Sequence, residues 1–350
     1  MTHPRAKAAA LRAIFEARGA QVVEPPILLS AETLLALYGE DIRGRAYVTT
    51  DALRGEQMLR PDFTVPVVQM HMAEGAEPAR YTYAGEVFRR QELDPDRANE
   101  YLQVGYEVFD RANPAAADAE VFALMADVLA PLGLRAVTGD IGLLMAAVAG
   151  LSTSDRRRAR LMRHIWRPRR FRSLLDQYAG RAPMPAQVDA ESEAPLNGLR
   201  SAAEIEARLA ALAEDAETPP IPSQEADGIG SLLKVQEKIP FAIEQLRDLS
   251  VDMPSIEQAV ERLSARTEAL RAQGVDVDQL DFEAGYGRTS MEYYDGFVFG
   301  FYAPTRADLP PVASGGRYDA LTRRLGKGAE IPAVGAVLRP KLMMELEAAS

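Results

Sequence analysis

Two neighbouring stretches of the sequence hold the polar side chains best suited to binding a small ligand, residues 81–92 and residues 101–110. Alternate side chains of a strand share one face, so Gln103, Gly105 and Glu107 should point to the same side. The glycine leaves a floor without a side chain, while Gln103 offers an acceptor and donors. Glu107 offers a carboxylate suited to an ammonium group or an imidazole N–H. The pattern is typical of a ligand site and equally of a solvated polar face on an antiparallel sheet.

Two other segments favour the ligand site. Residues 59–64 place Asp62 and Thr64 at a strand-to-helix junction. Residues 314–321 form a glycine–arginine cluster, which is followed by a glycine-containing run at residues 332–338. Each glycine run alone fits a simple turn. Their occurrence in this order along one chain indicates a composite site.

Hydrophobic periodicity and turn residues predict the elements that carry these groups. The first helix should end near Gly19, and Asn113 should cap a long helix. The pair Asp295-Gly296, flanked by aromatic and β-branched residues, predicts a hairpin turn. Strands are expected at residues 21–24, 80–90, 100–110, 278–282, 291–302 and 331–338, and helices at 30–38, 64–73 and 113–129.

The middle of the chain has a different character. Residues 151–274 show helical periodicity with polar breaks and no convincing alternation typical of a strand. The sequence therefore predicts a mixed α+β domain formed by residues 1–150 and 275–350. A helical insertion, residues 151–274, interrupts this domain.

Composition excludes several classes of protein. The formal net charge of -11 disfavours a protein that grips a nucleic-acid backbone. The absence of cysteine excludes disulfides and thiolate metal sites, and the three histidines, at positions 3, 71 and 164, form no ligand-spaced cluster. We therefore expect no metal and no cofactor. No apolar run approaches the roughly 20 residues of a membrane span, and we expect a cytoplasmic protein.

In order and content, these motifs resemble the catalytic domain of histidyl-tRNA synthetase, a class II aminoacyl-tRNA synthetase. Residues 85–92 with 102–110 resemble its motif 2, residues 291–299 its histidine-recognition segment, and residues 315–338 the approach to motif 3. The resemblance covers residues 5–150 and 278–342. It implies an α+β fold with an antiparallel sheet flanked by helices, a dimer, and a helical insertion before motif 3.

The resemblance also implies a histidine pocket. Glu107 and Tyr294 fall where the family grips the imidazole ring, and Arg89 falls at the arginine that meets the α-phosphate. Asp62 stands where the family usually has glutamate, which gives a shorter reach. The implied histidine-binding residues are Asp62, Thr64, Gln103, Glu107, Tyr293 and Tyr294.

The sequence departs from the family at the arginines that serve adenylation. Thr289 occupies the place of the arginine in the histidine segment, and Arg288 lies one position out of phase, which on a strand means the opposite face. Losing one such donor typically costs about a hundredfold to a thousandfold in rate. At motif 3, Leu342 or Lys341 takes the place of the arginine that holds ATP, and lysine lacks the planar guanidinium fork. We therefore do not expect adenylation. The chain ends at Ser350, and the anticodon-binding domain of the family is not expected.

Residues 156–172 contain nine arginines together with Trp166 and Phe171. This stretch fits a helix with a solvated basic face. It also fits a docking surface for an acidic partner subunit. A patch that binds single-stranded nucleic acid is the third interpretation.

Synthetase-like chains with these departures resemble the regulatory subunits of ATP phosphoribosyltransferase, the first enzyme of histidine biosynthesis. The resemblance implies a non-catalytic chain that activates a short catalytic subunit and confers feedback inhibition by histidine. It also implies a homodimer within a hetero-octamer. Two alternatives remain: an active histidyl-tRNA synthetase-like enzyme, and an RNA-binding translation-control module.

Overall fold

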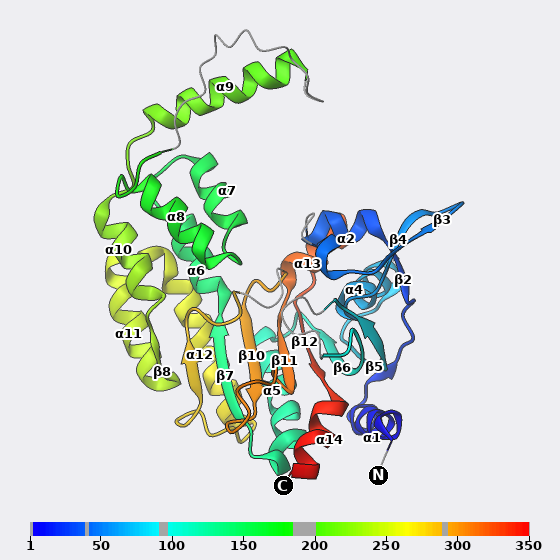
Figure 1. Ribbon diagram of the computed structural model, residues 1–350. Helices are drawn as coiled ribbons and strands as arrows, with labels where there is room; N and C mark the ends of the chain where they lie inside the picture. The colour runs from blue at the N-terminus through cyan, green and yellow to red at the C-terminus, as the bar shows by residue number, and fades with distance from the viewer. Residues whose placement is uncertain (1–2, 39–41, 91–96, 185–200, 289–292, 350) are drawn as a thin grey trace.

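A nine-stranded sheet forms the centre of the computed structural model, which describes residues 3–38, 42–90, 97–184, 201–288 and 293–349 (Figure 1). Neighbouring strands run antiparallel except in the pairs β1–β5 and β7–β9, which are parallel. The predicted α+β class is therefore confirmed, with a mixed sheet. Across the sheet the order is β1 (Gln21–Val22), β5 (Ala79–Phe88), β6 (Glu100–Phe109), β12 (Ala333–Leu338), β11 (Ala313–Arg317), β10 (Phe297–Tyr302), β7 (Arg135–Asp140), β9 (Asp281–Glu283) and β8 (Gln236–Lys238).

The two faces of the sheet have different roles, and β10 shows how. Its aromatic residues at alternate positions, Phe297, Phe299 and Phe301, turn toward Phe122, with ring centroids 5.2–6.1 Å apart. Phe122 belongs to α5 (Pro114–Leu129), which packs along β6, β11 and β12. The intervening residues of β10 point to the opposite face. One face of the sheet is therefore covered by helices and forms the core. The opposite face can carry a ligand site.

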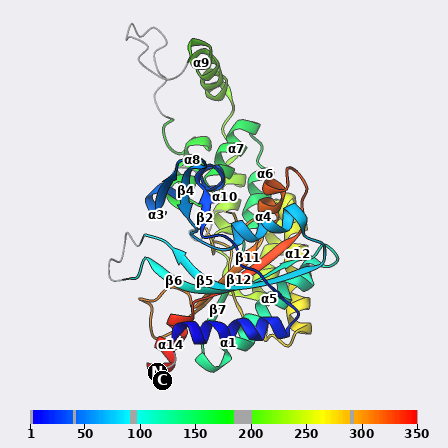
Figure 2. The same cartoon turned by 90° about the vertical axis from the view of Figure 1, so that its right-hand side faces the viewer.

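Helices cover the core face, which lies on the lower side of the sheet in Figure 2. The predicted capping residues are in place: the Asn113 side chain accepts a hydrogen bond from the Ala116 amide, and Gly19 has the left-handed φ of +88° that ends a helix. None of the helices in the described ranges combines the length and hydropathy that crossing a bilayer requires. Besides α5, this face carries α1 (Pro4–Ala17), α12 (Glu257–Ala272) and α14 (Pro340–Ala349).

A smaller, three-stranded sheet lies on the opposite side of the large sheet (Figure 2). Its strands follow the order β2–β4–β3; β3 and β4 lie within residues 47–60, whereas β2 comes earlier in the chain, at residues 28–30. The elements here are β2 (Leu28–Ser30), α2 (Ala31–Tyr38), α3 (Ile42–Arg45), β3 (Val48–Asp51), β4 (Gly55–Leu59), α4 (Thr64–Glu74) and α13 (Asp319–Leu325).

Residues 151–274 are mainly helical where the structure describes them, but they also contribute β8, a strand that the sequence did not indicate. β8 pairs with β9 at the edge of the large sheet, and α12 packs against α5. The division of the chain into a core and an insertion remains a prediction. The helices before α12 are α6 (Ile141–Ala149), α7 (Asp155–Arg163), α8 (Pro168–Tyr178), α9 (Ala202–Glu217), α10 (Ser223–Leu232) and α11 (Ile239–Asp252).

The predicted hairpin turn at Asp295-Gly296 is wrong. β10 begins just after this pair, and its two neighbours in the sheet are β7 and β11. Instead of closing a hairpin, the Asp295 carboxylate accepts hydrogen bonds from the backbone amides of Asp319 and Ala320 at the start of α13, at 3.0 and 2.5 Å. The Asp-Gly signal thus reflects a contact with a helix N-terminus that is distant in sequence.

A buried ion network joins α12 to the core. Arg266 of α12, only 3% exposed, donates to Asp118 of α5 at 3.3 Å and to Asp140 at the end of β7 at 2.6 Å. Its guanidinium also lies 4.4 Å from the ring centroid of Phe297. Asp118 accepts a second arginine, Arg317, at 2.7 Å. The network therefore ties α12 to both α5 and the sheet.

Replacing Arg266 with methionine should lower the free energy of unfolding by about 3–5 kcal/mol, because it leaves buried carboxylate oxygens without their cation. Urea unfolding measures this change. Arg271→Met, on the same helix, removes only exposed pairs with Glu268 and Asp278 and should change stability little. Equal effects of the two substitutions would contradict the assigned role of the network.

Candidate functional site

A cavity of about 290 Å³ opens on the sheet face opposite α5. It brings together residues from distant parts of the chain: the junction before α4, the ends of β5 and β6, and the segments that lead into β10 and out of β12. The glycines that form part of its floor are Gly315 and Gly335, on β11 and β12. The predicted site residues that line it are Asp62, Thr64, Arg89, Gln103, Tyr293 and Tyr294.

Glu107 lies directly behind the cavity wall and is only 1% exposed. Its Oε1 accepts hydrogen bonds from the hydroxyls of Tyr83 at 2.7 Å and Thr64 at 3.1 Å. Its Oε2 accepts the hydroxyl of Tyr318 at 2.6 Å. Burial raises the pKa of Glu107 to about 7, while the three donated hydrogen bonds oppose that rise. The solvated-face interpretation of this strand is therefore wrong.

Two glycines make room for this arrangement, and one of them corrects a prediction. A Cβ at Gly335 would lie 1.4 Å from Glu107 Oε2, so only glycine fits beneath the carboxylate. Gly105, expected to form an open floor for a ligand, instead lies against the ring of Tyr83, whose Cζ would be 2.1 Å from a Cβ at that position. The space above Gly105 is filled by this tyrosine, because the ring must reach Glu107.

Asp62 is buried at the entrance to α4 and faces the cavity. Its Oδ2 accepts the hydroxyl of Tyr38 from α2 at 2.7 Å and lies 4.0 Å from Arg89 Nη2. Arg89 is itself oriented by a 2.6 Å hydrogen bond from its Nε to the carbonyl of Pro61. The carboxylate and the guanidinium thus present opposite charges at neighbouring points of the wall.

Gln103 supplies the polar atom that most directly indicates a ligand. Its side chain is 1% exposed and lines the cavity, and its Oε1 has no hydrogen-bond partner among the described residues. A buried acceptor without a donor costs about 1–3 kcal/mol. A ligand N–H in the cavity would remove that cost.

Tyrosine hydroxyls form much of the remaining wall. Tyr293 and Tyr294 are each 8% exposed, and their rings meet edge to face with centroids 5.0 Å apart. Tyr286 and Tyr302 also line the cavity and share a hydroxyl–hydroxyl hydrogen bond of 2.9 Å. Sequence reasoning missed this second pair because Tyr286 lies in an irregular segment that carries no periodic signal.

Arg339 is a functional candidate that the sequence did not single out. It lines the cavity, whereas Lys341 and Leu342, the residues expected at the motif 3 arginine, do not. Burial lowers the pKa of Arg339, and the nearby charge of Arg89 acts in the same direction. The helix start at Pro340 turns the chain one residue after Arg339, so Arg339 lines the cavity and the two later residues do not.

Arg288 lies in a turn and not on a strand, so the phase argument does not apply, and it is not among the residues that line the cavity. It is 6% exposed, its Nε donates to the carbonyl of Ile165 at 2.9 Å, and its guanidinium lies 4.9 Å from the ring of Phe171. Thr289 lies outside the described residues. Arg288 therefore contributes to the packing of the α7–α8 region and not to the cavity.

The cavity combines acceptors for an ammonium group, hydroxyls, and two guanidinium groups for an anion. This donor set suits a zwitterionic small molecule such as an amino acid. Among the described residues, no group of three or more histidine, aspartate or glutamate side chains could hold a metal ion.

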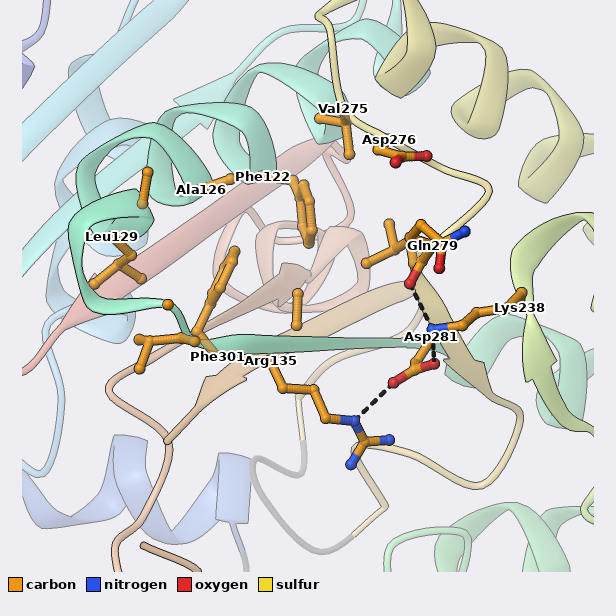
Figure 3. Close-up of a pocket in the computed structure, with 15 residues that line it drawn as sticks. Phe122, Ala126, Leu129, Arg135, Lys238, Val275, Asp276, Gln279, Asp281 and Phe301 are labelled. Carbon is orange, nitrogen blue, oxygen red and sulfur yellow. Dashed lines mark hydrogen bonds and ion pairs between the residues drawn. The ribbon is translucent and has the colours of Figure 1, made fainter. Parts of the chain in front are cut away.

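A second cavity, of about 540 Å³, lies on the α5 side of the sheet (Figure 3). Its floor includes Phe122 and Phe301, and its charged groups pair with one another: Asp281 accepts from Arg135 at 2.7 Å and from Lys238 at 2.6 Å. None of its lining residues is among the buried polar groups left without a partner in the described ranges. It therefore presents no unsatisfied group to a ligand.

Comparison with known proteins agrees with this geometry. A model of the histidyl-tRNA synthetase family matches residues 2–343. Curated proteins named ATP phosphoribosyltransferase regulatory subunit are 31% identical in Brucella anthropi, over 93% of each chain, and 31% identical in Mesorhizobium japonicum, over 94% of each chain. The chain belongs to the family of ATP phosphoribosyltransferase regulatory subunits. The prediction that the chain belongs to a family of regulatory subunits, and not of catalytic ones, is confirmed.

Solved structures share the fold of this regulatory subunit family. A Bacillus halodurans protein described as an ATP phosphoribosyltransferase regulatory subunit/histidyl-tRNA synthetase matches with a TM-score of 0.71 at 22% identity, over 98% of this chain and 78% of its own. A histidine–tRNA ligase subunit from Alicyclobacillus acidocaldarius matches with a TM-score of 0.64 at 24% identity, over 99% and 93%. The predicted histidyl-tRNA synthetase-like fold is confirmed.

The raised pKa of Glu107 predicts a defined pH dependence of stability. The folded protein holds the Glu107 proton up to about pH 7, whereas the unfolded chain releases it near 4.5. Folding therefore gains about 1.4 kcal/mol per pH unit from this group as the pH falls through that window, and the gain is lost as the pH rises through 7. In Glu107→Gln the gain is absent. Urea unfolding from pH 8 to pH 5 should show the wild type gaining stability relative to the variant; parallel curves would contradict the assignment.

Proposed function

We propose that this chain is a non-catalytic regulatory subunit that assembles with a short ATP phosphoribosyltransferase catalytic subunit in the cytoplasm, activates it, and confers inhibition by histidine. The relatives are named regulatory subunits of ATP phosphoribosyltransferase, and this name supports a catalytic subunit as the partner. Histidine as the effector rests on the cavity. The homodimer and the hetero-octamer, implied by the family resemblance, belong to the same proposal.

The observation that carries the effector assignment is the unpaired Oε1 of Gln103. Its side chain lines a cavity that Asp62 and Thr64 also line. An ammonium group has three donors and no acceptor, so three converging acceptors suit it. We assign Asp62, Thr64 and Gln103 to the α-amino group of the bound amino acid.

The side chain of the ligand is assigned from the buried end of the cavity. Glu107 Oε2 accepts one hydroxyl and lies over Gly335, which lines the cavity, and the Tyr294 ring packs against Gly316. A carboxylate and phenol groups can satisfy both nitrogens of an imidazole away from water. We assign Glu107, Tyr293 and Tyr294 to the imidazole of histidine.

Arg89 and Arg339 are assigned to an anion at the other side of the cavity. Both guanidinium groups line it, and Arg89 also faces Asp62. A bound histidine carboxylate, or a phosphate in that position, would offset their mutual repulsion. Histidine then acts as a feedback inhibitor if it binds one state of the complex more tightly, and a coupling of about 1–3 kcal/mol is typical.

The presence of Arg339 in the cavity favours one alternative, an active synthetase. Adenylation of histidine still lacks the arginine that would bridge the amino acid carboxylate and the α-phosphate, because Arg288 is directed to Ile165 and Phe171. We expect no histidine-dependent exchange of pyrophosphate into ATP. Exchange at a rate typical of synthetases would replace the regulatory proposal with this alternative.

The primary test measures the proposed activity directly. The purified chain is mixed with a short-form catalytic subunit from the same source, and phosphoribosyl-ATP formation is followed with and without histidine. We expect the chain to raise the rate and histidine to reverse that rise. A rate that the chain leaves unchanged, with no complex on a sizing column, would exclude the proposal.

A pocket variant tests the effector site separately. Gln103→Met removes an acceptor that has no partner among the described residues, so the fold should tolerate it. Loss of a hydrogen bond to a charged ammonium group should weaken histidine binding by about 10- to 100-fold in a calorimetric titration. The matched control is Gln245→Met on the exposed face of α11, which should bind histidine like the wild type. Equal affinity of all three proteins would show that Gln103 lies outside the binding site.

A further inference from the structure

The turn between α7 and α8 gathers positive charge on an otherwise acidic protein. Along α7, Arg156, Arg160 and Arg163 recur at spacings that place them on one face of the helix, while Arg157 and Leu161 are buried on the other. We use the name arginine turn for residues 160–170. In Figure 1 the two helices lie between the sheet and α9.

The arginines of this region divide into two groups. Some are fixed by carboxylates: Arg157 by Asp215 at 2.7 Å, and Arg172 by Asp176 at 3.1 Å. In contrast, Arg163 and Arg170 are exposed and form no ion pair within the described part of the chain. The solvated-face interpretation accounts for exposure but not for the concentration of unpaired charge.

His164 shows that these charges converge in space. It lies at the end of α7, and its Nδ1 is buried without a hydrogen-bond partner among the described residues. Burial lowers the pKa of its imidazole, and four guanidinium charges lower it further, namely those of Arg167, Arg170, Arg160 and Arg163. A histidine surrounded by arginines marks a local positive potential that the sequence charge of -11 conceals.

Buried donors lie directly beneath the turn. Arg288 donates to the carbonyl of Ile165, and its Nη2 is buried without a partner in the described residues. The Nε1 of Trp166, the residue that follows Ile165, is also buried without a partner in the described residues. Burial lowers the pKa of Arg288 to about 10. A guanidinium buried without a carboxylate is costly, and a carboxylate brought from outside would reduce that cost.

We infer that the arginine turn is the docking surface for an acidic patch of the catalytic subunit. This inference rests on the proposed function. It adds which surface of this chain binds the catalytic subunit, and that the contacting patch of the catalytic subunit is acidic. Carboxylates would pair with Arg163 and Arg170 at the rim of the contact. The acidity of the whole chain argues against a long polyanion such as RNA, which this charge would repel beyond the turn.

The position of Arg288 gives this docking surface access to the cavity. Its contact with Ile165 joins the turn to the segment that reaches Tyr293 and Tyr294 five and six residues later. Docking of the partner and binding of the effector therefore share one stretch of chain.

The test is a charge reversal in the full-length protein. Arg163→Glu combined with Arg170→Glu should weaken binding to the catalytic subunit by more than about tenfold, measured as the dissociation constant in sedimentation or calorimetric titrations. Wild-type binding should weaken as salt rises, and the variant should show a smaller salt dependence. The matched control reverses Arg247 and Arg262 to glutamate, two exposed arginines of α11 and α12, for the same change in net charge. It should bind within about twofold of the wild type.

The outcomes separate the two proposals. If the wild type forms a complex and the charge reversal binds equally well, the docking surface is wrong and the proposed function stands. If the wild type forms no complex with the catalytic subunit, the proposed function fails and the docking surface fails with it. If the reversal leaves the complex intact but removes salt-sensitive binding to a tRNA mixture in a filter assay, the turn is a nucleic-acid surface instead.

Discussion

The carboxylate of Glu107 is held away from water by hydroxyls of Thr64, Tyr83 and Tyr318, and the geometry of the cavity depends on this contact. The three donors belong to α4, β5 and the segment before α13, so one acid fixes three separate elements around one point. Withdrawing any donor would leave a buried acid short of a partner, which costs more than the hydrogen bond itself contributes. The same requirement explains the glycine at position 335, because only a residue without a side chain admits the carboxylate.

Binding an amino acid and adenylating it require different groups in this site. The positions of the arginines meet the first requirement and not the second. An amino acid needs acceptors for its ammonium group and donors for its carboxylate, which the cavity walls offer through Gln103, Arg89 and Arg339. Transfer of an adenylyl group also needs a cation between carboxylate and phosphate. Arg288, one residue away from that place, instead fastens the α7–α8 region.

The local signals predicted much of the fold, and distant contacts explain where they failed. Helix caps such as Asn113 and the long strands β5 and β6 depend on neighbours in sequence, so periodicity and capping rules found them. β7 and β8 were missed because they depend on partners distant in sequence: β7 pairs along its length with β10, and the three-residue β8 pairs with β9. Family resemblance indicated six of the residues that line the cavity. It missed Arg339, which lies immediately before a local helix start. Strand alternation misassigned the space over Gly105, because the occupant, Tyr83, comes from the neighbouring strand.

The pairing of β7 with β9 has a consequence for how this part of the chain can vary. The long excursion between these strands begins and ends in adjacent positions of one sheet, and Arg266 fixes its last helix to Asp140 at its beginning. Once both ends are held, the entropic cost of a longer or shorter excursion grows only with the logarithm of its length. Insertions and deletions in α9, α10 and α11, the outer helices beyond the α7–α8 region that Arg288 contacts, should therefore leave the cavity undisturbed. Within this fold, those helices are free to diverge in length while the sheet stays constant.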